Sequence, residues 1–160
     1  MASLPQLIEE DVHELERASQ DLLLKCDAGA ALIIDKGGFL ITQCGEYREF
    51  DTTTIAALSA ASFAATQSIA SLVSEANFTS VYQQGDTFSL LVMDVDEFCL
   101  LTVIFKSHIS VGAVKYFAAT TIKQIARQLK KARRRDPGGG LDLSEMNLAD
   151  PAPLFRKKSA

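Results

Sequence analysis

Apolar residues recur at every third or fourth position in three long segments, which is the spacing of one face of an α-helix. The first helix is expected to start at residues 3–6, where Ser3, Pro5 and Gln6 suit a helix N-terminus, and to end at residues 27–29. The second follows Asp51 and is expected to end before Asn77, and the third follows Ser110. The predicted buried stripes are Ile8, Val12, Leu15, Ser19, Leu22 and Cys26 in the first helix, and Val111, Val114, Ala118, Thr121, Ile125 and Leu129 in the third.

Five shorter apolar runs, separated by turn residues, are typical of β-strands. Residues 98–105 are apolar at consecutive positions, which predicts a central strand covered on both faces, whereas residues 79–84 are short and polar, as in an edge strand. The element order αββαβββα therefore predicts an α/β fold, a sandwich with a five-stranded, mainly antiparallel sheet and helices on both faces. The predicted strands are residues 30–35, 39–44, 79–84, 87–95 and 98–105.

The second predicted helix, residues 51–75, consists largely of small residues. A stripe of Ile55, Leu58, Ser62, Ala65, Ile69 and Leu72 is expected to face the core. A second stripe carries so little bulk that another backbone can approach it closely, which favours a contact surface; an alanine-rich helix chosen for propensity is the alternative. This small-residue stripe is Ala57, Ala60, Ala61, Ala64, Ser68 and Ser71.

The 160 residues suit one domain, residues 1–135, followed by a flexible C-terminal tail, residues 136–160, that starts with Asp-Pro and three Gly. No uninterrupted apolar run reaches the roughly 18 residues of a membrane span, and the acidic N-terminus does not resemble a signal peptide. Cys26, Cys44 and Cys99 are widely spaced, which predicts reduced thiols rather than a disulfide framework. We therefore expect a cytoplasmic protein.

The net charge of −4 conceals a strong asymmetry. Residues 1–122 contain 16 acidic and 6 basic side chains, whereas residues 123–135 contain seven cations and no acid. Cations in a last helical turn complement the helix dipole, but this number also suits an acidic partner or an anionic membrane, contacted through Arg133, Arg134 and Arg135. Nucleic acid is not expected, because the cluster lacks interleaved aromatic residues.

Candidate catalytic and ligand-binding residues are few. His13 and His108 are far apart in the sequence, and the cysteines lack the spacing of a zinc site. The acidic residues at 94–97 fall where a hairpin turn is needed, and no glycine motif matches a phosphate-binding loop. We therefore expect no catalytic residue, no metal and no cofactor, and thus no enzyme active site.

The distribution of these motifs resembles the Roadblock / dynein light chain family, and within it the bacterial MglB-like proteins. The residues that carry the resemblance span about residues 5–133: Ile34-Asp35-Lys36 with Gly38, Asp51-Thr52-Thr53, the alanine-rich residues 56–70, Val103-Ile104-Phe105, and Ser110 with Gly112.

The resemblance implies a homodimer in which the second helices pair antiparallel and the third strands join the two sheets. It implies a role in cell polarity as a GTPase-activating regulator: a small Ras-like GTPase binds the paired helices, and its own catalytic residues are repositioned without an inserted arginine finger. Arg48, before the second helix, is the one candidate for such a finger. The candidate dimer and partner residues are Ala57, Ala60, Ala61, Ala64, Ser68, Thr79, Val81 and Gln83.

Two alternatives stay open at this point. The same fold can act as a non-catalytic scaffold or adaptor for a GTPase, a motor or a membrane-associated complex. The tail can contribute contacts to a partner through its apolar residues, which are Leu143, Met146, Leu154 and Phe155.

Overall fold

The computed structural model describes residues 4–135 of the chain. Three helices and five strands follow one another in the order that the hydrophobic pattern predicts, so the predicted fold class is confirmed. The predicted tail, residues 136–160, lies outside the described residues. The elements are α1 (Glu9–Cys26), β1 (Ala30–Asp35), β2 (Leu40–Gly45), α2 (Thr52–Leu72), β3 (Ser80–Gln84), β4 (Phe88–Asp94), β5 (Cys99–Lys106) and α3 (Val111–Arg135).

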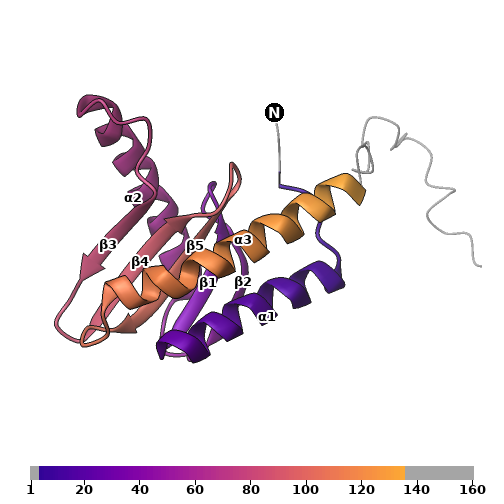
Figure 1. The fold of residues 1–160 in the computed structure, drawn as a ribbon, viewed down its shortest axis with the longest axis horizontal. Helices are drawn as coiled ribbons and strands as arrows, with labels where there is room; N and C mark the ends of the chain where they lie inside the picture. The colour runs from indigo at the N-terminus through magenta and orange to yellow at the C-terminus, as the bar shows by residue number, and fades with distance from the viewer. Residues whose placement is uncertain (1–3, 136–160) are drawn as a thin grey trace, which may run out of the picture.

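The five strands form one antiparallel sheet in the order β2-β1-β5-β4-β3. A hairpin of β1 and β2 joins a meander of β3, β4 and β5 where β1 pairs with β5. Figure 1 shows α1 and α3 side by side in front of the sheet and α2 behind it. β5 is therefore central and β3 lies at one edge, which confirms both predictions made from the polarity of these strands.

The two faces of the sheet are covered unequally. The face beneath α1 and α3 belongs to a core cluster of seventeen buried residues, whereas the cluster beneath α2 contains seven. α2 contributes Ala56, Ala60 and Phe63 to this smaller cluster, which they form with alternate residues of β1, β4 and β5. Successive side chains of each strand point to opposite faces of the sheet, so the strands contribute to both core clusters. A single helix, α2, covers one of these faces.

α1 starts later than predicted. Its first residue is Glu9, and the start expected at residues 3–6 is wrong, because the first turn is capped by Asp11: its Oδ2 accepts a hydrogen bond from the Ile8 N–H at 2.9 Å. Ser3 lies outside the described residues. α1 ends at Cys26, and the following residue, Asp27, adopts the left-handed conformation (φ 56°) common after a helix C-terminus.

Asp11 is a buried charge that joins the two ends of the domain. Arg135 donates to it from both terminal guanidinium nitrogens at 2.8 Å, and Gln128 Nε2 donates at 2.7 Å. The Arg135 guanidinium holds the pKa of the Asp11 carboxyl well below its usual range, although burial acts in the opposite direction. The first turn of α1 is therefore fastened to the last turn of α3 by charge-assisted hydrogen bonds.

The Asp11 contacts predict an acid-sensitive contribution to stability. Because the folded-state pKa is lowered, the contribution is present above the unfolded-state pKa of about 4 and is lost as the pH falls below that value. We expect Asp11→Asn to lower the unfolding free energy by about 2 kcal/mol at pH 7, with a smaller difference from the unmodified chain at pH 3. Urea unfolding at fixed protein concentration measures both values.

Asp21→Asn is the matched control, because Asp21 pairs with Lys25 on the exposed surface of the same helix. Its effect at pH 7 should stay below about 0.5 kcal/mol. Equal effects of the two substitutions would contradict the role assigned to Asp11.

Candidate interaction surface

α2 has no charged side chain in 21 residues. Its N-terminus is fixed by Asp51, whose side chain accepts hydrogen bonds from the Thr54 N–H at 3.1 Å and the Thr54 hydroxyl at 2.7 Å. This confirms Asp51 as the N-cap. The helix ends at Leu72, three residues before the predicted end, and Ser74 then takes a positive φ of 60°.

Most of the stripe of larger residues predicted to face the core is exposed. Leu58, Ile69 and Leu72 are 64%, 52% and 83% exposed, so the prediction is wrong for these residues. It holds for Ile55, which is half-buried and packs against the smaller core cluster. The sheet beneath α2 carries bulky side chains, so α2 packs against it mainly through small residues. Phe63 is the one large buried residue of the helix. The buried residues are Thr52, Ala56, Ser59, Ala60, Phe63 and Ala70.

The exposed side of α2 therefore combines small residues with large aliphatic ones. Figure 1 shows the C-terminal end of the helix extending beyond the sheet, which agrees with the high exposure of Leu72. We call this surface the α2 outer face; it consists of Ala57, Leu58, Ala61, Ala64, Ala65, Ser68, Ile69 and Leu72.

The hydroxyl groups on this side of the helix are satisfied by the helix itself. Ser68 donates to the Ala64 carbonyl oxygen at 3.4 Å, and Ser71 donates to the Ser68 carbonyl oxygen at 2.7 Å. Such back-bonding removes the need for an outside hydrogen-bond partner. A partner can therefore cover the α2 outer face without depriving the Ser68 and Ser71 hydroxyl groups of a hydrogen bond.

β3 provides an open strand edge, since within the described residues it pairs only with β4. Gly85 N–H donates to the Phe88 carbonyl, and the Thr79 carbonyl accepts from the Asp94 N–H. Antiparallel pairing alternates, so odd-numbered residues direct their backbone groups to β4 and even-numbered residues direct theirs outward. The outward residues are Ser80, Tyr82 and Gln84.

These three residues were not among the predicted site residues. The predicted Thr79, Val81 and Gln83 use their backbone groups within the sheet, so only their side chains are available to a partner. The sequence signal is the position of each residue relative to the turn at Gly85. Counting alternate residues back from Gly85 separates those whose backbone groups pair with β4 from those whose backbone groups point outward.

An apolar groove lies between the N-terminal part of α2 and the β3–β4 hairpin. Phe50 and Phe88 pack edge to face across it with ring centroids 5.4 Å apart, and Ile55 and Gln84 are also part of its lining. The groove links α2 to the open edge of the sheet.

The structure divides the predicted small-residue stripe. Ala57, Ala61, Ala64 and Ser68 are exposed and belong to the α2 outer face. Ala60 does not belong to it, because it is 5% exposed and packs in the core beneath the helix. The predicted tail contacts Leu143, Met146, Leu154 and Phe155 lie outside the described residues.

α2 also has the length and composition of a membrane span, with a mean hydropathy of 1.4 over 18 residues, of which 28% are buried. No single uninterrupted apolar run underlies this value, since serine, threonine and glutamine recur along the helix. A helix that packs in a core or at an interface passes the same test, so hydropathy alone does not assign α2 to a membrane.

The basic end of α3 is partly used within the domain. Arg133 Nη2 lies 3.0 Å from Asp96 Oδ2, Arg133 Nη1 lies 2.9 Å from Glu97 Oε1, and Arg135 binds Asp11. Of the three arginines predicted to meet an acidic partner or membrane, only Arg134 has no such internal pair among residues 4–135.

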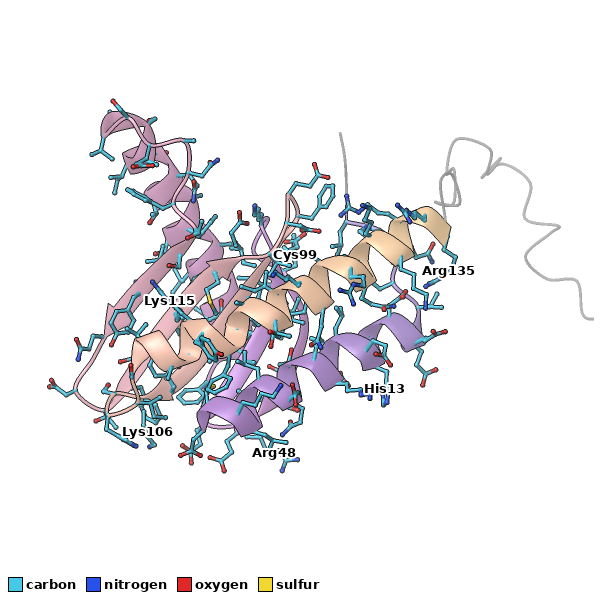
Figure 2. All side chains as sticks on the ribbon, in the orientation of Figure 1. His13, Arg48, Cys99, Lys106, Lys115 and Arg135 are labelled. Atoms are coloured by element: carbon cyan, nitrogen blue, oxygen red, sulfur yellow. The ribbon has the colours of Figure 1, made fainter. Side chains whose placement is uncertain are left out.

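The remaining candidates have structural roles or lie at the surface. Asp96 accepts hydrogen bonds from the Phe98 and Cys99 N–H groups, which confirms turn chemistry in the β4–β5 connection. Burial raises the pKa of the Cys44 thiol to about 11 and that of the Cys99 thiol to about 12, so both are protonated at neutral pH. His13 and Arg48 lie at the surface (Figure 2).

These features define a small α/β domain that exposes an uncharged helix face beside an open strand edge. Within residues 4–135, no cluster of His, Cys, Asp or Glu could hold a metal ion. The family model of the Roadblock/LC7 domain matches residues 15–105, which is more than half of the chain. The chain belongs to the Roadblock/LC7 family.

Solved structures of MglB proteins are similar to this chain over nearly their whole length. MglB of Myxococcus xanthus is 26% identical, with a TM-score of 0.73, covering 79% of this chain and 96% of that one. The gliding protein MglB of Thermus thermophilus is 26% identical, with a TM-score of 0.74 and coverages of 82% and 99%. An MglB with a tetrameric arrangement is 27% identical, with a TM-score of 0.76 and coverages of 82% and 99%. A comparison with curated proteins found no match.

The burial of α2 predicts opposite outcomes for two alanines one turn apart. Ala64→Arg should leave the fold intact, because its side chain points to solvent, whereas Ala60→Arg should unfold the domain, because a cation cannot be accommodated against the sheet. Circular dichroism and urea unfolding of the two variants test this. A folded Ala60→Arg variant or an unfolded Ala64→Arg variant would show that the faces of α2 are misassigned.

Proposed function

We propose that this chain is a homodimeric regulator of a small Ras-like GTPase and that it stimulates GTP hydrolysis by that GTPase. The observation that carries the proposal is the α2 outer face, which exposes Leu58, Ile69 and Leu72 on a helix without charges. A contiguous exposed apolar surface of this kind marks an interaction site, whereas isolated apolar residues do not. Membership of the Roadblock/LC7 family and similarity to MglB structures support the choice of partner.

The proposed dimer uses two features of the same side of the domain. Ala57, Ala61, Ala64 and Ser68 recur at intervals of four, three and four residues, so two copies of α2 can approach closely along this line while larger side chains flank it. The outward backbone groups of β3 can pair with those of a second β3 across the same two-fold axis, which would remove the open edge.

The dimer then presents two neighbouring α2 helices as a platform for one GTPase. Neither α2 nor β3 contains Lys or Arg, so the platform carries no cation that could neutralise charge on a transferred phosphoryl group. Stimulation would therefore act through the position of the GTPase's own catalytic groups. The chain contributes shape and apolar area in this proposal, and the GTPase contributes the chemistry.

The hydrolysis of GTP by a small Ras-like GTPase from the same organism as this chain tests the proposal. We expect a higher single-turnover rate with a saturating amount of this protein, and no stimulation by Ala64→Arg, because a bulky cation at the centre of the α2 outer face blocks close approach. Ala119→Arg is the matched control, since it places the same side chain on the exposed surface of α3. Sedimentation of both variants reports the dimer separately. Unchanged hydrolysis with saturating unmodified protein would refute stimulation.

Arg48 separates two ways of stimulating hydrolysis. It is exposed in the connection between β2 and α2 and is the arginine nearest in sequence to the platform. Because the proposal requires no arginine finger, Arg48→Ala should retain nearly full stimulation. A loss of about a thousandfold, which is typical when an arginine finger is removed, would assign the catalytic role to Arg48 instead.

A scaffold without effect on hydrolysis is the second candidate, and the same surface supports it. It predicts that the GTPase binds the dimer with an unchanged rate of hydrolysis, and that Ala64→Arg abolishes binding. A binding measurement run in parallel with the hydrolysis assay distinguishes the two.

A further inference from the structure

The cations of α3 fall into two groups. Lys131, Arg133 and Arg135 turn toward the rest of the domain, where Lys131 Nζ lies 3.3 Å from Glu10 Oε1 and the two arginines bind Asp96, Glu97 and Asp11. Arg133 also lies over the ring of Phe98, 4.6 Å from its centroid. These three side chains serve the fold.

The second group is an exposed line of charge. Lys123, Arg127, Lys130 and Arg134 are separated by four, three and four residues, so they lie within an arc of about 60° on a helix with 3.6 residues per turn. All four are exposed, and within residues 4–135 none of them forms an ion pair. The buried residues of α3, from Val114 to Ala132, lie on the opposite side of the helix. We call the four cations the α3 outer stripe.

The stripe runs toward the end of the helix from which the chain continues into an acidic segment. Residues 136–150 contain Asp136, Asp142, Glu145 and Asp150 and no cation, and the last three of these acids, in residues 141–150, bring three negative charges to the four positive charges of the stripe. Gly138, Gly139 and Gly140 precede most of these acids, and glycine permits the backbone conformations that a reversal of direction requires. The stripe spans about 16 Å at 1.5 Å per helical residue, which ten residues can cover in either a helical or an extended conformation.

We propose that the acidic segment, residues 141–150, folds back and binds along the α3 outer stripe of its own chain. Each exposed ion pair is worth no more than about 1 kcal/mol and is weakened by salt. Several pairs in one register, on a segment tethered next to its site, act together because tethering supplies a high effective concentration. The contact covers the stripe in the free protein, and an outside acidic partner has to displace it.

The charges of the domain favour this occupant over a second copy of the chain. The neighbouring helix α1 is acidic, but Asp11, Glu10 and Asp21 are already paired with Arg135, Lys131 and Lys25. In a second copy, the carboxylates of residues 4–135 that form no ion pair are spread along the chain from Glu9 to Asp86. Asp142, Glu145 and Asp150, by contrast, lie within nine residues that contain no cation and are tethered next to the stripe. The contact depends on charge, not on the GTPase, so it can hold even if the proposed function fails.

Zero-length carbodiimide cross-linking of the full chain tests the contact, because it joins a carboxylate to a lysine amine only when they touch. We expect Lys123 and Lys130 to couple to Asp142, Glu145 or Asp150 at about 0.01 M salt. The yield should fall at about 1 M salt, where the screening length shortens from about 30 Å to about 3 Å. The pairs Lys131–Glu10 and Lys36–Asp94, with separations of 3.3 Å and 2.7 Å, serve as internal positive controls.

A variant with Arg127→Gln and Arg134→Gln keeps both reporting lysines but halves the charge of the stripe, so its cross-linking yield should fall several-fold. Arg48→Gln with Lys106→Gln is the matched control, because it removes two exposed cations that lie outside α1 and α3 and should leave the yield unchanged. Mixing isotope-labelled and unlabelled chains identifies cross-links within one chain.

Three outcomes would overturn the proposal. The first is formation of the control pairs without any coupling of residues 141–150 to Lys123 or Lys130. The second is equal coupling of this segment to all exposed lysines, which would show random encounters. The third is coupling only between labelled and unlabelled chains, which would place the segment on a second copy.

Discussion

The structure depends on one constraint: a five-stranded sheet has two apolar faces, and the chain provides three helices to cover them. α1 and α3 cover one face and complete the larger core cluster, while α2 alone covers the other. β5 lies at the centre, with its residues from Cys99 to Phe105 buried, and therefore requires cover on both sides. The unequal division of helices determines which surfaces remain available to other molecules.

The single-helix face explains the unusual composition of α2. Bulky residues of the sheet, such as Leu32, Ile34 and Leu100, occupy the space between the layers, so the helix packs against them through Ala56 and Ala60. Its larger aliphatic residues are left on the outside, where burial against another protein is favourable and burial in the monomer is impossible. On the opposite side of the sheet, the C-terminal part of α3 carries a cluster of cations. Three of them, Lys131, Arg133 and Arg135, form ion pairs within the domain. The two sides of the sheet thus present different chemistry.

Much of this architecture could be predicted from the sequence, because the patterns in α1, α3 and the strands have strong contrast. The buried stripe of α3 from Val114 to Leu129 and the central position of β5 were both predictable. The orientation of α2 was not, because nearly every position of this helix is apolar or small, and its periodicity does not distinguish an inner from an outer side. Phe63 was the one informative residue, since it is the largest on the helix and faces the sheet.

Which residues of β3 face outward depends on the register of β3 with β4, and a shift of one position exchanges Val81 for Tyr82. The partners of Arg133 and Arg135 lie 36 to 124 positions away in the sequence, so no local pattern identifies them.

The contact between Asp11 and Arg135 also has a consequence for how the domain comes to be folded. The two residues are separated by 124 positions, and β1 pairs with β5 rather than with β4. During synthesis the β1–β2 hairpin is made long before β5, and α1 long before α3, so the larger core cannot close until the chain has been made beyond Leu129. Such non-local pairing slows folding. Newly made chains therefore pass through a stage at which the apolar side of α1 lacks its helical neighbour, and this stage ends only with the last helix.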